Sequence, residues 1–186
     1  MTRILVIYAT DYGNTEKMAH AIVSGASSVP DTDVTLKKVE EVIAGDLEGS
    51  DGIILGTPVH MGSPDWRIKK FIDTLCGGMW LKDSLVGKAG AVFATGSGYG
   101  GGGGGCELTM LALLTNFAEL GMILVPLPRR TPGYPAGGLQ WGPYGRSAGV
   151  NMEQDGIREE SLEAARHHGA NVARIAGLAK GQRLFA

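Results

Sequence analysis

Residues 4–15 of the chain read ILVIYATDYGNT: an apolar run, then a polar turn, and helical spacing begins directly afterwards at residues 18–26. An apolar run without polar alternation is typical of a strand buried on both faces of a parallel sheet. The helical segment returns apolar side chains every three to four residues. A strand, a tight turn and an amphipathic helix in this order predict the first unit of an α/β fold.

The same alternation of strand and helix continues along the chain, so we predict the α/β class over a single domain of residues 1–186. Further apolar runs lie at residues 53–55, 91–94 and 122–125, and an alternating edge strand is expected at residues 34–37. Helical spacing recurs at residues 68–75, 108–120 and 162–176.

The overall composition restricts the class of partner. Seventeen Lys and Arg against nineteen Asp and Glu give a net charge of -2 at pH 7. Nucleic-acid binding usually needs a basic surface, so nucleic acid is not an expected partner. No uncharged apolar run approaches the roughly 18 residues that a membrane-spanning helix needs. We expect a cytoplasmic protein without a membrane span or a cleaved leader.

Cysteine and histidine spacing gives no sign of a metal site. Cys76 and Cys106 lie far apart without a Cys-x-x-Cys pair, and we interpret both as small buried apolar residues. His20, His167 and His168 lie on helical segments and are expected at the surface.

Two segments stand apart from the simple alternation. The helix at residues 108–120 is apolar almost all round, which core burial or a homodimer interface would explain equally well. Residues 128–153 lack periodicity, and we expect a long loop insertion that forms an ordered binding loop because of its aromatic residues. These aromatic residues are Tyr134, Trp141 and Tyr144.

Loops that follow strands of a parallel sheet meet at its carboxyl edge, where ligands of such folds bind. The first loop, residues 10–15, carries hydroxyls and an amide at a helix N-terminus, which is a favourable place for a phosphate. An ordinary capped turn is the alternative interpretation. Asp11 counts against an anion unless its carboxylate points away.

The loop after residues 91–94 is rich in glycine. Residues 96–101 match the dinucleotide pattern Gly-x-Gly-x-x-Gly, but the match lies on the wrong βα unit and no acidic residue ends the next strand. Close approach of the backbone to a ligand explains the glycines better. No Walker loop occurs in the chain, so nucleotide hydrolysis has no motif here.

Five segments together resemble the flavodoxin-like NAD(P)H:quinone oxidoreductases, the WrbA-like FMN proteins. They read VIYATDYGNT, GTPVHMG, GGMWLKDSLVGK, ATGSGYGG and GPYGRS. The resemblance implies a doubly wound, five-stranded parallel sheet in the order 2-1-3-4-5 with helices on both faces. It also implies FMN, with the phosphate at residues 10–15, the ring edge at 57–62 and the pyrimidine side at 95–100.

The residues to which this resemblance assigns cofactor contacts come from the three loops and two aromatic positions. They are Thr10, Asp11, Tyr12, Gly13, Asn14, Thr15, Thr57, Pro58, Val59, His60, Met61, Gly62, Trp80, Thr95, Gly96, Ser97, Gly98, Tyr99, Gly100 and Tyr144. Core packing for Trp80, and packing within its own loop for Tyr144, are the alternatives.

The second loop departs from the family pattern. Where the family usually carries Thr-Arg-Phe, this chain has Val59-His60-Met61, so a guanidinium and an aromatic ring are missing. His60 is the candidate catalytic side chain, with an exposed loop histidine as the alternative. A shortened connection at residues 40–51 leaves the choice between dimer and tetramer open.

The resemblance implies an FMN-dependent enzyme that takes a hydride from NADH or NADPH and passes it to a quinone-like acceptor. Flavin supplies such chemistry without a nucleophilic side chain. A one-electron flavodoxin carrier is one alternative, although such carriers usually need a strongly acidic docking face. A non-catalytic flavodoxin-like binding module is the other.

Overall fold

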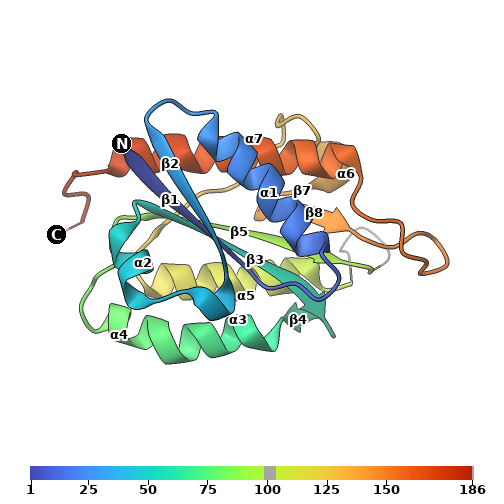
Figure 1. Ribbon diagram of the computed structural model, residues 1–186, viewed down its shortest axis with the longest axis horizontal. Coiled ribbons are helices and arrows are strands. Elements are labelled where there is room, and N and C mark those ends of the chain that lie inside the picture. Colours follow the sequence, from blue (N-terminus) through green and yellow to red (C-terminus); the bar gives the residue numbers. More distant parts are fainter. Residues whose placement is uncertain (99–103, 186) are drawn as a thin grey trace.

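The predicted parallel sheet forms the middle layer of the structure. Figure 1 shows the computed structural model, which describes residues 1–98 and 104–185. Four long strands pair in parallel in the order β2-β1-β3-β5. Their bounds are Thr2–Tyr8 for β1, Thr32–Lys38 for β2, Gly52–His60 for β3 and Ala89–Gly96 for β5. The predicted strand order is confirmed, and β2 alternates between exposed and half-buried residues as an edge strand does.

Two separate segments share the fifth strand position. β6 (Ile123–Leu124) pairs in parallel with the start of β5, and β8 (Gly142–Arg146) pairs in parallel with its end. The intervening chain holds α6 (Tyr134–Gly137) and β7 (Gly138–Leu139), which is antiparallel to β8. Part of the segment that we expected to be a loop is therefore built into the sheet.

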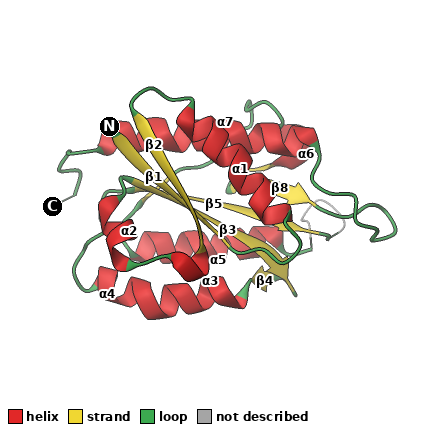
Figure 2. Cartoon of the chain, in the orientation of Figure 1, coloured by secondary structure: helices red, strands yellow, loops and turns green. Residues whose placement is uncertain are grey.

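Helices cover both faces of the sheet (Figures 1 and 2). One face carries α1 (Asn14–Ser27) and α7 (Glu159–Ala179), which pack closely against each other. The other face carries α5 (Cys106–Glu119) and a continuous helical run of α3 (Trp66–Phe71), the π-helical η2 (Ile72–Cys76) and α4 (Gly77–Trp80). Short elements complete the chain: η1 (Val39–Glu41), α2 (Ala44–Gly49) and β4 (Ser63–Pro64).

Side chains of β1 alternate between the two cores. Ile4 and Val6 pack in the core under α1 and α7, whereas Leu5 and Ile7 pack in the core under α3 and α5. All four are at most 2% exposed. Since successive strand residues point to opposite faces, burial on both sides explains the uninterrupted apolar run in the sequence.

Glycines allow α1 and α7 to approach closely. A methyl group at Gly25 would lie 1.7 Å from the carbonyl oxygen of Arg166, and one at Gly169 would lie 2.2 Å from that of Ile22. Both distances are far below van der Waals contact, so any larger side chain would separate the helices. This packing fixes the N-terminus of α1 over the carboxyl edge of the sheet.

The apolar pattern of α5 reflects core burial. Leu108 is 69% exposed and Leu111 is half-buried, whereas the remaining large apolar residues of residues 108–120 are buried. These residues are Met110, Leu113, Leu114, Phe117 and Leu120. The structure therefore removes most of the reason for expecting a second subunit on this helix.

The prediction that His168 lies at the surface is wrong. Its side chain is fully buried on α7, whereas His20 and His167 are exposed as predicted. Position 168 follows Ala164 and Ala165 by one helical turn, and both of these face the core. Neither ring nitrogen of His168 has a hydrogen-bond partner among the described residues, and burial lowers its pKa to about 4.

Both cysteines are buried, as predicted, and neither forms a disulfide. Burial raises the pKa of both Cys76 and Cys106 to about 11, so neither is a reactive thiolate at neutral pH. Among the helices of the described residues, none is long and apolar enough to cross a membrane.

Candidate functional site

The three predicted loops meet at the carboxyl edge of the sheet and line one cavity of about 110 Å³. Its lining comes from the first loop, the end of β3, the end of β5 and one residue after β8. These residues are Thr10, Asp11, Tyr12, Asn14, Thr15, Pro58, Val59, His60, Thr95, Gly96, Ser97 and Ser147. Parallel strands bring them together because their carboxyl ends lie at the same edge.

The first loop presents an uncapped helix N-terminus to this cavity. Gly13 is the N-cap of α1 with φ 80°, and no side chain forms a capping hydrogen bond there. The hydroxyl of Thr10 instead accepts a hydrogen bond from the Gly13 N–H at 3.0 Å. The first N–H groups of a helix have no acceptor within it. This geometry favours the anion site over the capped turn, because the donors of α1 remain available.

A buried hydrogen bond joins the first loop to the third. Thr15 Oγ1 and Thr95 Oγ1 lie 2.7 Å apart, and both side chains are at most 3% exposed. One hydroxyl donates to the other, so the proton of the accepting hydroxyl stays available for an anion in the cavity.

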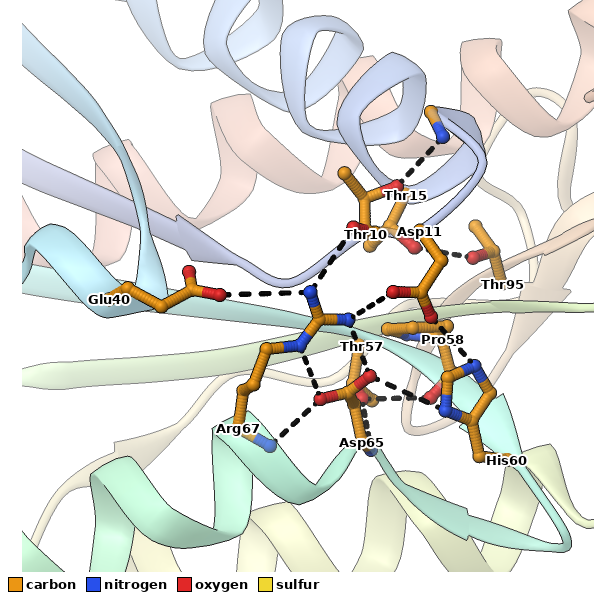
Figure 3. Close-up of polar contacts among 11 residues, drawn as sticks. Thr10, Asp11, Thr15, Glu40, Thr57, Pro58, His60, Asp65, Arg67 and Thr95 are labelled. Carbon is orange, nitrogen blue, oxygen red and sulfur yellow. Dashed lines mark hydrogen bonds and ion pairs between the residues drawn. The ribbon is translucent and has the colours of Figure 1, made fainter.

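Asp11 is turned toward the side chains of Arg67 and His60 (Figure 3). Its Oδ1 accepts a hydrogen bond from Arg67 Nη2 at 2.7 Å, and its Oδ2 lies 3.3 Å from His60 Nε2. The Asp11 carboxylate therefore points toward these two side chains, as a phosphate in the first loop would require.

Arg67 is a site residue that sequence reasoning missed. Its Nε and Nη2 donate to the two carboxylate oxygens of Asp65 at 2.8 and 2.7 Å, and its Nη1 donates to the Thr10 carbonyl at 3.4 Å. Figure 3 shows the guanidinium between these groups and Glu40, whose carboxylate lies 3.7 Å away. A guanidinium from α3 thus contacts the first loop, at Thr10 and Asp11.

Asp65, at the start of α3, holds the Arg67 guanidinium in place. It is 1% exposed, caps α3 by accepting from the Arg67 N–H, and donates its own N–H to the Thr57 hydroxyl at 2.9 Å. Burial alone would raise the pKa of Asp65, but hydrogen bonds from Arg67 and the charge of Arg67 hold it below its ordinary value. Asp65 is therefore a fixed carboxylate at neutral pH.

The second loop is a tight hairpin between β3 and β4. His60 pairs with Ser63, and the two turn residues Met61 and Gly62 have φ values of 51° and 75°. Two positive φ values are typical of the type I′ hairpin turn. Met61 is fully exposed at the tip, and His60 lies between Asp11 and Asp65, with Nδ1 3.4 Å from Asp65 Oδ2.

Tyr144 contacts the start of the third loop from the neighbouring strand β8. It lies on β8 opposite Ala94, and its hydroxyl donates to the Gly96 carbonyl at 3.0 Å. Burial raises the pKa of Tyr144 above its ordinary value. Tyr144 does not line the cavity, and neither does Trp141, which packs half-buried against the core. Tyr144 therefore positions Gly96 and does not wall the site.

Glycines also allow the third loop to lie against the second. A methyl group at Gly105 would lie 2.6 Å from the α-carbon of Gly62, and one at Gly104 would lie 2.8 Å from that of Gly98. Tyr99 and Gly100, which we expected at the cofactor, lie outside the described residues. The rest of the third loop contributes Thr95, Gly96 and Ser97 to the cavity lining.

Trp80 is not brought together with the other predicted residues. It ends α4, which lies at the other end of the molecule from the β3–β4 hairpin in Figure 1. There it lines a groove with Ile72, Cys76 and Leu120 and is half exposed. Within this chain, Trp80 does not approach the cavity.

Asp11, His60 and Asp65 form a group that could hold a metal ion. Each offers a ligand atom, and these atoms lie within 4.8 Å of one another. Arg67 already binds both carboxylates, so a divalent cation there would face the guanidinium charge at short range. The geometry favours an ion-pair network.

A doubly wound parallel sheet with an uncapped helix N-terminus at its carboxyl edge is an arrangement at which α/β proteins can bind a phosphate group. The chain belongs to the flavodoxin family, because the family model Flavodoxin matches residues 6–116, more than half of its 186 residues. Proteins of this family bind FMN and have a redox role in electron transfer.

Solved structures agree with this assignment. The chain is 27% identical to a flavodoxin, WrbA-like protein from Agrobacterium tumefaciens, with a TM-score of 0.73 over 97% of this chain and 100% of that one. It is 26% identical to Flavodoxin 2 from Bacillus cereus, with a TM-score of 0.63 over 95% and 99% of the two chains. A flavodoxin from the domain Archaea, 18% identical with a TM-score of 0.69 over 95% and 99%, shares the fold.

The residues present fit FMN. The uncapped α1 N-terminus and the Thr10 and Thr15 hydroxyls suit its phosphate, and the pairing of Asp11 with Arg67 removes a carboxylate from that position. Exposed Tyr12 and Met61 on the first and second loops offer apolar surface to a planar ring.

Proposed function

We propose that the chain is an FMN-dependent NAD(P)H:quinone oxidoreductase. Bound FMN supplies two-electron hydride chemistry, and the protein supplies binding, orientation and nearby dipoles. The observation that carries the proposal is the full-length similarity to the WrbA-like protein, together with the five sequence segments that resemble the quinone oxidoreductases. The physiological electron donor in this proposal is NADH or NADPH, and the acceptor is a quinone.

The proposed roles of the site residues follow the three loops. Residues 10–15 bind the phosphate through the N–H groups of α1 and through hydroxyls. Residues 57–62 hold one edge of the ring, with Met61 against its face. Backbone N–H groups of Ser97 and Gly98 stabilise negative charge at the pyrimidine side. His60 stays the candidate for proton handling near the ring, since Asp11 and Asp65 flank it.

A one-electron carrier is the second candidate function. The match to the family model and the 26% identity to Flavodoxin 2 favour it. Docking of a carrier to its redox partners usually depends on strong charge complementarity. A net charge of -2 provides little charge for such docking, so we favour the reductase over the carrier.

Flavin loading and turnover test the proposal together. The purified protein would be reconstituted with FMN, and oxidation of NADH and of NADPH would be followed with and without a benzoquinone. Quinone-dependent oxidation of either nucleotide supports the reductase. Tight FMN binding without nucleotide oxidation supports the carrier, and failure to retain FMN supports the non-catalytic module.

Oligomeric state and location complete the proposal. We keep the expected homo-oligomer as a proposal, with Leu108 on α5 as its apolar contact, although most of the apolar surface of this helix is buried in the core. We propose a cytoplasmic location, which suits two buried cysteines that form no disulfide.

A further inference from the structure

The guanidinium of Arg67 joins the first loop, at the candidate phosphate position, to the start of α3. It contacts Asp11 and the Thr10 carbonyl in the first loop, and Asp65 at the start of α3 (Figure 3). Its side chain is 18% exposed, so these contacts lie largely out of solvent. Electrostatic interactions are stronger in such surroundings than in bulk water.

The position of Asp11 makes this contact important. Asp11 lines the same cavity as Asn14 and Thr15, at the N-terminus of α1. A carboxylate is itself attracted to a helix N-terminus. Without a partner, Asp11 would therefore compete for the donors that a phosphate needs, and would repel the phosphate.

We propose that Arg67 is a positioning residue for FMN, which holds the Asp11 carboxylate away from the phosphate and joins the first loop to the start of α3. The inference rests on the proposed phosphate position at residues 10–15. It does not depend on whether the electron acceptor is a quinone.

The geometry explains why arginine suits this position. Its planar fork makes two parallel bonds to Asp65 and keeps Nη2 within reach of Asp11. Asp65 is itself held by the hydrogen bond from its N–H to Thr57. A chain of contacts therefore runs from β3 through Asp65 and Arg67 to the first loop.

His60 also faces Asp11, with Nε2 3.3 Å from the carboxylate, and its side chain is more exposed than that of Arg67. Glu40 faces Arg67 from η1 at 3.7 Å and adds a third carboxylate to the network. Because Asp65 takes two of the guanidinium bonds and Asp11 takes one, loss of Arg67 would leave both carboxylates without their main cation.

A comparison of FMN with riboflavin tests the inference, because riboflavin lacks the phosphate. Dissociation constants would be measured by equilibrium dialysis, with flavin absorbance as the readout. Arg67→Met should weaken FMN binding by about tenfold or more, because an unpaired carboxylate then lies near the phosphate. Riboflavin binding should stay within about twofold of the wild type, since a neutral ligand does not feel that charge.

A second substitution separates the electrostatic role from a structural one. Asp11→Asn in the Arg67→Met background should restore FMN affinity to within about threefold of the wild type. The Asp11→Asn variant alone should bind FMN at least as tightly as the wild type. This measurement tests the inference even if the Arg67→Met variant does not fold. Lys69→Met is the matched control, because it removes one positive charge from α3 while its partner is Asp73.

Three results would overturn the inference. They are equal losses of FMN and riboflavin affinity in Arg67→Met, no recovery in the double variant, and a tenfold loss in Asp11→Asn alone. A wild-type protein that binds riboflavin and FMN equally would contradict the proposed phosphate position itself. Loss of quinone reduction with intact FMN binding would contradict only the reductase proposal.

Discussion

Thr15 and Thr95 share a buried hydrogen bond of 2.7 Å, which ties the start of α1 to the end of β5. The two residues are 80 positions apart in the sequence. Together with the Arg67 contacts, this bond ties the first loop to the end of β5 and to the start of α3 through the protein's own side chains. A site held in this way loses little conformational freedom when a cofactor binds.

Thr15→Glu should abolish FMN binding. The substitution puts a carboxylate where we propose the phosphate, so like-charge repulsion adds to the loss of the hydroxyl. FMN titration by equilibrium dialysis measures the effect.

Thr15→Val is the control for this substitution, because it keeps the shape of the side chain and adds no charge. It should weaken FMN binding by about tenfold, which corresponds to one hydrogen bond of about 1.4 kcal/mol. Unchanged FMN affinity in a folded Thr15→Glu variant would show that the phosphate lies elsewhere.

Tyr144→Phe should loosen the third loop. The hydroxyl that donates to the Gly96 carbonyl is lost, and a half-buried acceptor is left without that donor. We expect a loss of about 1 kcal/mol in the free energy of unfolding and a several-fold weaker affinity for FMN. Urea denaturation and FMN titration check both effects, and Tyr134→Phe, away from the cavity lining, is the control. An unaltered affinity would mean that Tyr144 does not position the loop.

His168 should make the protein sensitive to mild acid. Its pKa is lowered from 6.5 to about 4 in the folded protein, so below pH 6.5 the unfolded chain takes up a proton that the folded chain does not. Stability is therefore unaffected by this group above pH 6.5 and falls as the pH drops toward 4. The expected loss at pH 5 is about 2 kcal/mol, from 1.36 kcal/mol per pKa unit.

His168→Leu should reduce this loss, because leucine carries no titrating group and the ring nitrogens have no partner among the described residues. Urea denaturation at pH 5, 6 and 7 measures the difference between wild type and variant. His167→Leu changes the exposed neighbour and should leave the pH dependence as in the wild type. Parallel pH curves for wild type and His168→Leu would contradict the prediction.

Nicotinamide and quinone should use one site in turn over the exposed flavin face. Hydride transfer needs near-contact with the ring, and we expect the other sides of the ring to be taken up by the three loops. Steady-state kinetics should therefore be ping-pong, with parallel double-reciprocal lines and mutual substrate inhibition at high concentration. Intersecting lines together with a detectable ternary complex would rule out a shared site.

Leu108→Lys should separate subunits if α5 forms an interface. Leu108 is 69% exposed on a helix whose other face is buried, so a charge there leaves the core untouched. Light scattering at micromolar concentration should show a homo-oligomer for the wild type and a smaller species for the variant. Monomeric wild-type protein would contradict the proposed assembly.

The strands of the sheet could be predicted because burial on both faces leaves uninterrupted apolar runs. β8 could not, since its residues read Gly-Pro-Tyr-Gly-Arg, and glycine and proline are unfavourable in strands. Pairing with β5 overrides that local preference. The prediction for His168 was wrong because helical spacing alone did not show which of the two adjacent histidines faces the core.

The loops of the candidate site could be predicted because parallel strands bring their carboxyl ends together. Arg67 could not, since its contact with Asp11 joins residues 56 positions apart and leaves no local pattern. The only sequence signal nearby is Asp65, an acidic residue at a helix start, which predicts a cap and nothing about the first loop. Trp80 was assigned by resemblance, and the fold places α4 away from the cavity.

The division of the fifth strand position between β6 and β8 has a consequence for how this chain can diversify. Both segments are anchored to β5, so the points where residues 125–141 leave and rejoin the sheet are fixed by pairing. Because the entropy of closing a loop grows slowly with its length, we expect longer or shorter inserts between these two anchors to be tolerated. Recognition segments can therefore be exchanged here, by evolution or by grafting, while the strand order at the cofactor edge is inherited unchanged.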